Sequence, residues 1–221
     1  MENKNEEDLK ALQLRFVGKV IAGFTHEIKN YLAIIKESSG LIGDMIKMGK
    51  LSEDDIPEYL DIIQSIEDQI GKATEHFTHL NRFSHRMDTQ ISAFNLNECM
   101  EELIALLNRF ARQKKIVLET DFQQDLPPVK SNPSILQLLV FSFLEKKIAG
   151  LEKNGRITVR TGAVDNAVAV KIIPEGTFAE EDTDAGMTAD KIRENFIKQL
   201  GGNISQGTAK ETVITLPVHG V

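Results

Sequence analysis

The sequence of 221 residues contains no tryptophan, a single cysteine and only 6% aromatic residues. The lone cysteine, Cys99, excludes an internal disulfide and is typical of a reducing compartment. Basic residues are the minority, with 26 lysines and arginines against 33 aspartates and glutamates and a formal net charge of −7. Because nucleic-acid-binding surfaces are normally basic, this balance argues against a nucleic-acid partner.

Long apolar runs are also missing. No stretch approaches the ~20 apolar residues that a membrane-spanning helix needs. The first ten residues, MENKNEEDLK, are polar and acidic, unlike a secretory signal peptide. We therefore expect a cytoplasmic protein that does not engage a membrane, with one large domain or two small ones.

The first ninety residues are patterned as two long helices. Residues 8–47 contain no proline, and their apolar side chains recur every three or four positions, as in one long amphipathic helix. This stripe contains Leu9, Leu12, Phe16, Val20, Phe24, Ile28, Leu32, Ile35, Ile42 and Ile46. A second helix is predicted after Ser52, with apolar residues in a strict three–four alternation. This second stripe contains Ile63, Ile66, Ile70, Ala73, Phe77 and Leu80.

Two long helices with a short connection predict a helical hairpin. A lone hairpin leaves much of its apolar surface in water, so we expect it to form a homodimeric four-helix bundle. The helical pattern stops between Met87 and Phe94, which places the boundary between two domains, residues 1–90 and 91–221.

The second half mixes helices with mostly antiparallel strands, which predicts an α+β fold with an α/β two-layer sandwich. Asn95 and Asn132–Pro133 are placed as helix starts, 116–122 alternates like a strand, and Asp165–Asn166 joins two strands of a hairpin. A last helix over 188–200 ends at two glycines before a final strand.

The stretch FTHEIKN places a histidine in the middle of the first helix. At ~100° per residue, His26 lies roughly 160° from the apolar stripe and faces solvent. Asn30 lies one turn away on the same outer face, and Glu27 flanks the stripe. The pattern therefore predicts an exposed imidazole with an amide and a carboxylate beside it.

The run VGKVIAGFTHEIKNYLAIIK resembles the H-box of sensor histidine kinases, through Gly18, Ala22, Gly23, His26, Glu27, Ile28 and Asn30. The resemblance implies that His26 is phosphorylated on a ring nitrogen, that Glu27 accepts its other proton, and that Asn30 can orient a water for dephosphorylation of the partner. Tyr31 departs from the proline that is usual in the family.

Three more histidines, His76, His79 and His85, lie on the predicted second helix. A metal site in a helical bundle usually has Glu-x-x-His pairs that point inward, and this pattern is absent here, so we expect no metal there.

The second half resembles the ATP-binding domain of the same family, from the Leu-Pro-Pro-Val run at 126–129 to the Gly-Gly-x-Ile and Leu-Pro ending. At the positions of the family's nucleotide-binding motifs, however, the residues of this sequence differ from the family pattern. Lys146 lies near the expected Mg²⁺-binding asparagine, Pro174 near the adenine-reading aspartate, and only Gly186 remains of the glycine-rich loop near 187–189. Glu180, Glu181, Asp182 and Asp184 precede that loop and would repel phosphates. We therefore expect neither ATP nor Mg²⁺ as a cofactor.

These features favour a phosphorelay protein, a homodimeric histidine phosphotransferase whose His26 exchanges a phosphoryl group with aspartates of response-regulator receiver domains. Two alternatives stay open. One is an active sensor histidine kinase core with a divergent ATP site, and the other is a non-catalytic scaffold that docks receiver domains.

Overall fold

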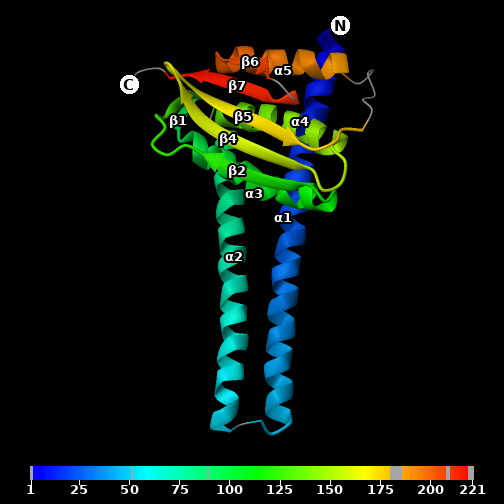
Figure 1. Cartoon of the computed structure of the whole chain (residues 1–221), viewed down its shortest axis with the longest axis vertical. Helices are drawn as coiled ribbons and strands as arrows, with labels where there is room; N and C mark the ends of the chain where they lie inside the picture. Colours follow the sequence, from blue (N-terminus) through cyan, green and yellow to red (C-terminus); the bar gives the residue numbers. More distant parts are fainter. Residues whose placement is uncertain (1, 51, 89, 180–185, 208–209, 219–221) are drawn as a thin grey trace.

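A long antiparallel hairpin forms the stalk of the molecule (Figure 1). The computed structural model describes residues 2–50, 52–88, 90–179, 186–207 and 210–218, without the side chains of 2–6, 8 and 186–190. Helix α1 spans Glu2–Lys47, and α2 spans Ile56–Asp88 after the short 3₁₀ helix η1, Glu53–Asp55. The Ser52 amide donates to Asp55 Oδ2 over 2.9 Å, which fixes the predicted start of the second helical segment. In the described part of the chain, no helix is both long and apolar enough to cross a bilayer.

An α/β sandwich follows the hairpin, as the sequence predicts. Its helices are α3 (Leu96–Gln113), α4 (Pro133–Gly150) and α5 (Gly186–Leu200). Its strands are β1 (Ser92–Phe94), β2 (Val117–Phe122), β3 (Val129–Ser131), β4 (Arg156–Val164), β5 (Ala167–Glu175), β6 (Asn203–Gln206) and β7 (Thr212–Pro217). We call the part from β1 to β7 the α/β unit.

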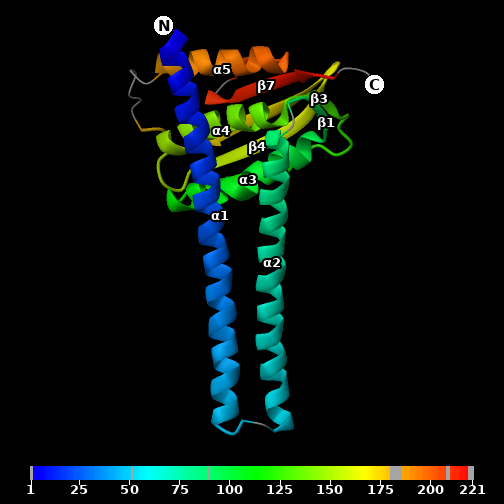
Figure 2. The same ribbon diagram turned by 180° about the vertical axis from the view of Figure 1, so that it is seen from behind.

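The main sheet has the order β2-β4-β5-β7-β6, in which only the β2–β4 pair is parallel. Strands β1 and β3 form a separate antiparallel pair. The three helices cover one face of the main sheet, and the hairpin lies against that helical layer (Figure 2). The sandwich is thus two-layered, with α1 and α2 added on the helical side.

Local sequence signals explain where the elements begin and end. The Asn95 side chain accepts from the amides of Asn97 and Glu98 at the start of α3, and Asn132 accepts from the Ile135 amide at the start of α4. Helix α5 ends at Leu200 and is followed by Gly201, whose φ of 67° is the left-handed conformation that glycine tolerates. These positions are the ones that the sequence marks as boundaries.

Helix α1 packs against the α/β unit as well as against α2. Phe16 of α1 lies 4.7 Å from the ring of Phe141 in α4 and 5.3 Å from that of Phe83 in α2. Arg86 near the end of α2 forms a two-pronged ion pair with the fully buried Glu102 of α3, at 2.6 and 2.9 Å. The hairpin and the α/β unit therefore share one apolar core.

The two apolar stripes are only partly buried in the single chain, as expected for a lone hairpin. The upper residues of the α1 stripe, such as Leu12 and Val20, are buried, whereas Leu32 is 57% exposed. The α2 stripe divides in the same way: Ile63, Ile70 and Phe77 are exposed, and the residues between them are half-buried. The reason is that α1 and α2 turn only part of their apolar surface toward each other.

Candidate phosphoacceptor site

His26 is exposed on α1, as predicted, with 47% of its side chain accessible. The Asn30 amide nitrogen lies 3.2 Å from His26 Nδ1, and Glu27 Oε1 lies 3.9 Å from the same nitrogen. Both neighbours therefore approach the same ring nitrogen, Nδ1. An amide donor and a carboxylate acceptor next to one nitrogen give the ring two alternative partners, one for each tautomer.

Glu27 is buried, whereas its sequence neighbour His26 is exposed. Only 8% of the residue is accessible, and its Oε2 pairs with Arg112 Nη2 of α3 at 2.9 Å. A buried carboxylate needs such a partner, because an unpaired charge is costly away from water. Arg112 is a residue that the sequence reading missed, because helical periodicity does not show which arginine of α3 meets α1.

Helix α3 comes very close to α1 just before the histidine. A Cβ added at Gly23 would lie 2.8 Å from the Leu106 carbonyl oxygen and 3.3 Å from the Phe110 ring. Arg109 Nη1 also donates to the Ala22 carbonyl oxygen at 3.3 Å. The glycine of the H-box run thus permits contact between the two helices three residues before His26.

The three histidines of α2 differ in their exposure. His79 is buried, with 8% of the residue accessible, and its Nε2 lies 3.8 Å from Glu75 Oε1. The His76 ring is half-buried and lies 5.6 Å from the Tyr31 ring of α1. His85 is exposed. Among the described residues, no group of three potential ligands is arranged to hold a metal ion.

We expect His76 to make the fold sensitive to acid. Burial lowers its pKa, partly offset by the negative charge of Glu27 and Glu75, while His79 and Arg112 lower it further. The unfolded chain therefore takes up a proton near pH ~6.5 before the folded chain does, so stability is lost as the pH falls through that value.

The test is the melting temperature of the wild type and of His76→Asn at about pH 7.5 and about pH 5.5. The variant should lose less of its melting temperature on acidification than the wild type does. His85→Asn, which removes an exposed histidine from the same helix, should behave like the wild type. Equal losses in all three proteins would contradict the role given to His76.

The positions that the resemblance assigns to nucleotide binding carry other side chains. Lys146 is exposed on α4, and Lys147 is buried and donates to the Lys210 carbonyl oxygen. Pro174 is a buried residue of β5 that pairs with Ile157 of β4. Residues 187–189 lie in the first turn of α5, and Glu180, Glu181, Asp182 and Asp184 lie outside the described residues. The described side chains at Lys146 and Pro174 do not fit a Mg²⁺ ion or an adenine amine.

An arginine side chain lies between α4 and α5. Arg193 of α5 is buried and donates to the Ser142 carbonyl oxygen at 2.8 Å and to Ser142 Oγ at 3.1 Å. Its guanidinium lies 4.5 Å from the centre of the Phe143 ring. These contacts join the two helices through side chains of the protein itself.

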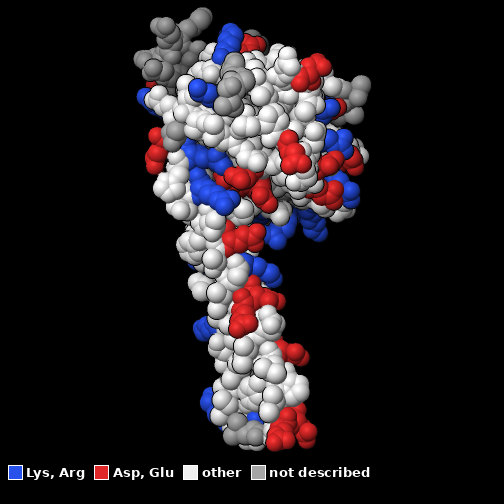
Figure 3. All heavy atoms as spheres, turned by 90° about the vertical axis from the view of Figure 1, so that its left-hand side faces the viewer, with Lys and Arg blue, Asp and Glu red and all other residues white. Residues whose placement is uncertain are grey.

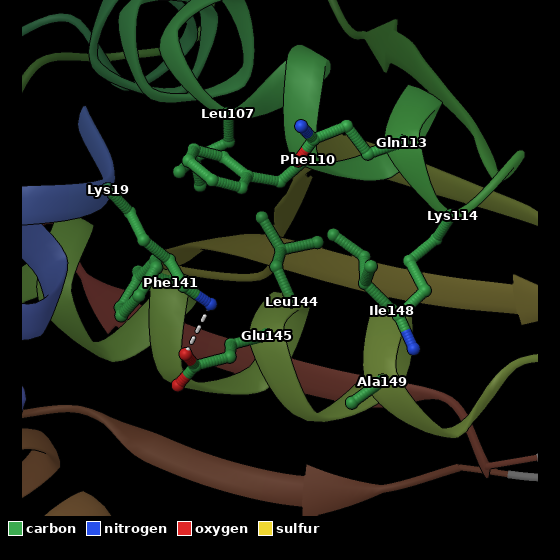
Figure 4. A pocket seen from close by; sticks show the side chains of 10 residues that line it. All are labelled: Lys19, Leu107, Phe110, Gln113, Lys114, Phe141, Leu144, Glu145, Ile148 and Ala149. Atoms are coloured by element: carbon green, nitrogen blue, oxygen red, sulfur yellow. Dashed lines mark hydrogen bonds and ion pairs between the residues drawn. The ribbon is translucent and has the colours of Figure 1, made fainter. Parts of the chain in front are cut away.

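A separate pocket of about 430 Å³ lies between α3 and α4, beside α1 (Figure 4). Apolar side chains such as Phe110, Phe141 and Leu144 line it, and the ion pair of Lys19 with Glu145, at 2.6 Å, lies at its edge. Arg15 also approaches Glu145, at 3.5 Å. This pair joins α1 to α4 on the same side of the unit as the contacts of Glu27 with α3.

Curated proteins with similar sequences are histidine kinases. No protein-family model matches the chain. The signal transduction histidine-protein kinase AtoS of Escherichia coli is 24% identical over 168 residues, covering 76% of this chain and 26% of AtoS. Sporulation kinase E of Bacillus subtilis is 26% identical over 185 residues, covering 83% and 23%. The cell-division control histidine kinase PdhS of Brucella anthropi is 23% identical over 175 residues, covering 79% and 16%. The chain thus spans about a quarter or less of each relative.

Solved structures with the same fold are also histidine kinases. The catalytic domain of histidine kinase ThkA superimposes with a TM-score of 0.51 at 16% identity, covering 58% of this chain and 96% of that domain. Full-length ShkA, solved in complex with AMPPNP, has a TM-score of 0.50 at 13% identity over 89% of this chain and 46% of its own. At this identity the structures establish the fold. The chain has the fold of histidine kinase catalytic domains, and its sequence is similar to those of two-component histidine kinases.

Proposed function

We propose that this chain is a histidine phosphotransferase of a phosphorelay, in which His26 accepts a phosphoryl group from one response-regulator aspartate and passes it to another. The observation that carries this proposal is the exposed His26 imidazole, whose Nδ1 is approached by both Asn30 and Glu27. The sequence similarity to AtoS and sporulation kinase E supports a role in two-component signalling.

The proposed reaction uses the two ring nitrogens differently. Nε2 attacks the phosphorus of an aspartyl phosphate, the bond between phosphorus and the aspartate oxygen breaks, and the carboxylate leaves. When the ring carries its proton on Nδ1, Glu27 Oε1 is the nearby group that can hold that proton. The reverse steps return the phosphoryl group to a second aspartate. Such transfer asks little of the protein beyond positioning and charge stabilisation.

Asn30 gives the site a second outcome, the transfer of the phosphoryl group to water. Its side-chain amide lies beside the ring on the outer face of α1. A partner aspartyl phosphate that docks over His26 would meet this amide, which can hold a water by a hydrogen bond. Loss of phosphate from the partner is therefore expected to depend on Asn30.

A homodimer completes the proposal. Ile63, Ile70 and Phe77 recur at seven-residue spacing on α2 and are 43%, 51% and 53% exposed. Figure 3 shows a strip of the stalk with few charged side chains between its charged edges. A second hairpin that packs on this exposed row would bury it and form a four-helix bundle, the arrangement that such hairpins commonly adopt.

We place the source of the phosphoryl group outside this chain. Lys146 and Pro174 do not supply the ligands of Mg²⁺ and adenine. Between α4 and α5, the Arg193 side chain links the two helices through contacts within the protein.

The decisive experiment incubates the pure protein with labelled ATP and, separately, with a phosphorylated receiver domain. Acid-labile label on the protein from the receiver alone is the expected result. Label from ATP would instead make the chain a kinase, and label from neither would leave a scaffold that docks receiver domains.

Thermal melting gives an independent test of nucleotide binding. We expect no rise in melting temperature with millimolar ATP and Mg²⁺, because the described residues at the nucleotide positions do not fit the ligand. A ligand present at 100 times its dissociation constant would add about 2.7 kcal/mol to the free energy of unfolding, an easily measured shift. ATP without Mg²⁺ is the control for nonspecific effects. A clear, Mg²⁺-dependent rise would favour an active kinase core.

A further inference from the structure

We propose that Arg112 of the α/β unit is a positioning residue for phosphoryl transfer at His26. In this view the α/β unit is a fixed part of the transfer site, because it holds the carboxylate of Glu27 in place beside the histidine. The inference rests on the proposed function, since it assigns a role in the same reaction.

The first step is the contact between the two helices. Helix α3 reaches α1 at three points, through Arg109 at the Ala22 carbonyl oxygen, Leu106 at Gly23, and Arg112 at Glu27. On α1 these points extend from four residues before His26 to one residue after it. The α/β unit thus meets α1 at the phosphoacceptor, in addition to its contacts further up the helix.

The second step concerns the two oxygens of Glu27. Arg112 binds Oε2 at 2.9 Å, and the other oxygen, Oε1, is the one that lies 3.9 Å from His26 Nδ1. An arginine bound to one oxygen of a buried carboxylate fixes the direction of the other. A shift of about 0.7 Å would bring Oε1 from 3.9 Å to within hydrogen-bonding distance of Nδ1, a range that ends at ~3.2 Å.

The third step is the choice of tautomer. In the arrangement seen here, Nδ1 is nearest to the Asn30 amide, at 3.2 Å. If that amide donates to Nδ1, the ring proton is on Nε2, and Nε2 has no lone pair with which to attack phosphorus. When Oε1 accepts a proton from Nδ1, Nε2 becomes the nucleophile. Arg112 therefore favours transfer by keeping Oε1 available to compete with Asn30.

Other charged and titratable groups surround Glu27 but do not hold it in the same way. Tyr31 of α1 and Glu75 and His76 of α2 belong to the same cluster, and Glu27 raises the pKa of the Tyr31 phenol, after the larger effect of burial. Within the described chain, the ion pair that reaches Glu27 from the α/β unit is that of Arg112. This arginine is thus the link by which that unit acts on the site.

The experiment measures the rate at which the full-length protein takes label from a phosphorylated receiver domain. Arg112→Ala should lower this rate about tenfold, a part of the ~10²–10⁴ that a positioned acid or base contributes. Arg112→Lys should recover part of the loss, since lysine can still donate to the carboxylate. Arg109→Ala is the matched control, because Arg109 lies on the same helix and interface but contacts a backbone carbonyl, and it should transfer at nearly the wild-type rate.

A double-mutant cycle and a spectroscopic measurement separate positioning from packing. In the background of Glu27→Gln, Arg112→Ala should cause no further loss, because both changes act through one carboxylate. Nitrogen NMR of the His26 ring should show more of the tautomer protonated on Nε2 in Arg112→Ala than in the wild type.

The results that would overturn the inference are distinct from those that would overturn the proposed function. If the wild type takes label and Arg112→Ala takes it equally fast or faster, the arginine does not position Glu27. Equal losses in Arg112→Ala and Arg109→Ala, or additive losses with Glu27→Gln, would assign the effect to the interface. If the wild type takes no label, the phosphotransferase proposal fails, and an unchanged ring tautomer in Arg112→Ala would still refute the inference.

Discussion

Replacing His26 with glutamine is expected to abolish acceptance of phosphate from a phosphorylated receiver domain. Glutamine fills a similar volume, but its amide nitrogen cannot attack phosphorus. The fold should be almost unchanged, because His26 is 47% exposed at its side chain and exposed substitutions usually shift stability by less than ~0.5 kcal/mol. Acid-labile label on the protein after mixing is the readout, and circular dichroism reports on the fold.

Asn30→Ala is the companion variant, and in contrast to His26→Gln we expect it to keep phosphate acceptance. It should still accept phosphate, because the nucleophilic ring is intact, whereas loss of phosphate from the partner to water should slow. If His26→Gln still carries acid-labile label, another residue is the acceptor, and His76, His79 and His85 are the next candidates. A protein in which neither substitution changes any transfer would be a scaffold rather than a phosphotransferase.

Local chemistry made much of the fold predictable from the sequence. The asparagine caps of α3 and α4, the glycine pair after α5 and the hairpin turn at Asp165 all act within a few residues, so their effects can be predicted from the sequence alone. The exposure of His26 also follows from one number, the ~100° turn per residue of a helix. For the same reason, its proximity to Asn30 was predictable.

Contacts between distant segments could not be predicted in this way. The pair of Glu27 with Arg112 joins residues from two helices that the sequence separates widely, and nothing in the pattern of α3 distinguishes Arg112 from Arg109. The burial of His79 has the same origin, because this residue of α2 lies beside residues of α3 such as Ile104 and Asn108. Helical periodicity reports which face of a helix is apolar, but it does not report which neighbour covers each part of that face.

The division of the α2 stripe has a consequence for assembly. Its half-buried members, Ile66, Ala73 and Leu80, alternate with the exposed Ile63, Ile70 and Phe77. In a bundle, one row packs within the hairpin and the other row packs against a second hairpin. A symmetric dimer would place the exposed row of each chain at the same interface.

Ile70→Glu is therefore expected to split the dimer while leaving the single chain folded. Ile70 is 51% exposed in the isolated chain, so the glutamate can remain solvated there. In the dimer, two symmetry-related carboxylates would have to be buried without partners, at a cost of at least about 3 kcal/mol for the pair. This corresponds to a dissociation constant about 100-fold higher, since each 1.4 kcal/mol is a factor of ~10.

Sedimentation velocity of the full-length protein over a range of concentrations measures the effect. Lys72→Glu is the matched control, because Lys72 is exposed and lies about 160° around α2 from Ile70, at ~100° per residue. The wild type and Lys72→Glu should sediment as dimers at concentrations where Ile70→Glu is a monomer with unchanged helix content. A wild type that sediments as a monomer throughout would refute the four-helix bundle. Dimers of all three proteins would place the interface away from this row of α2.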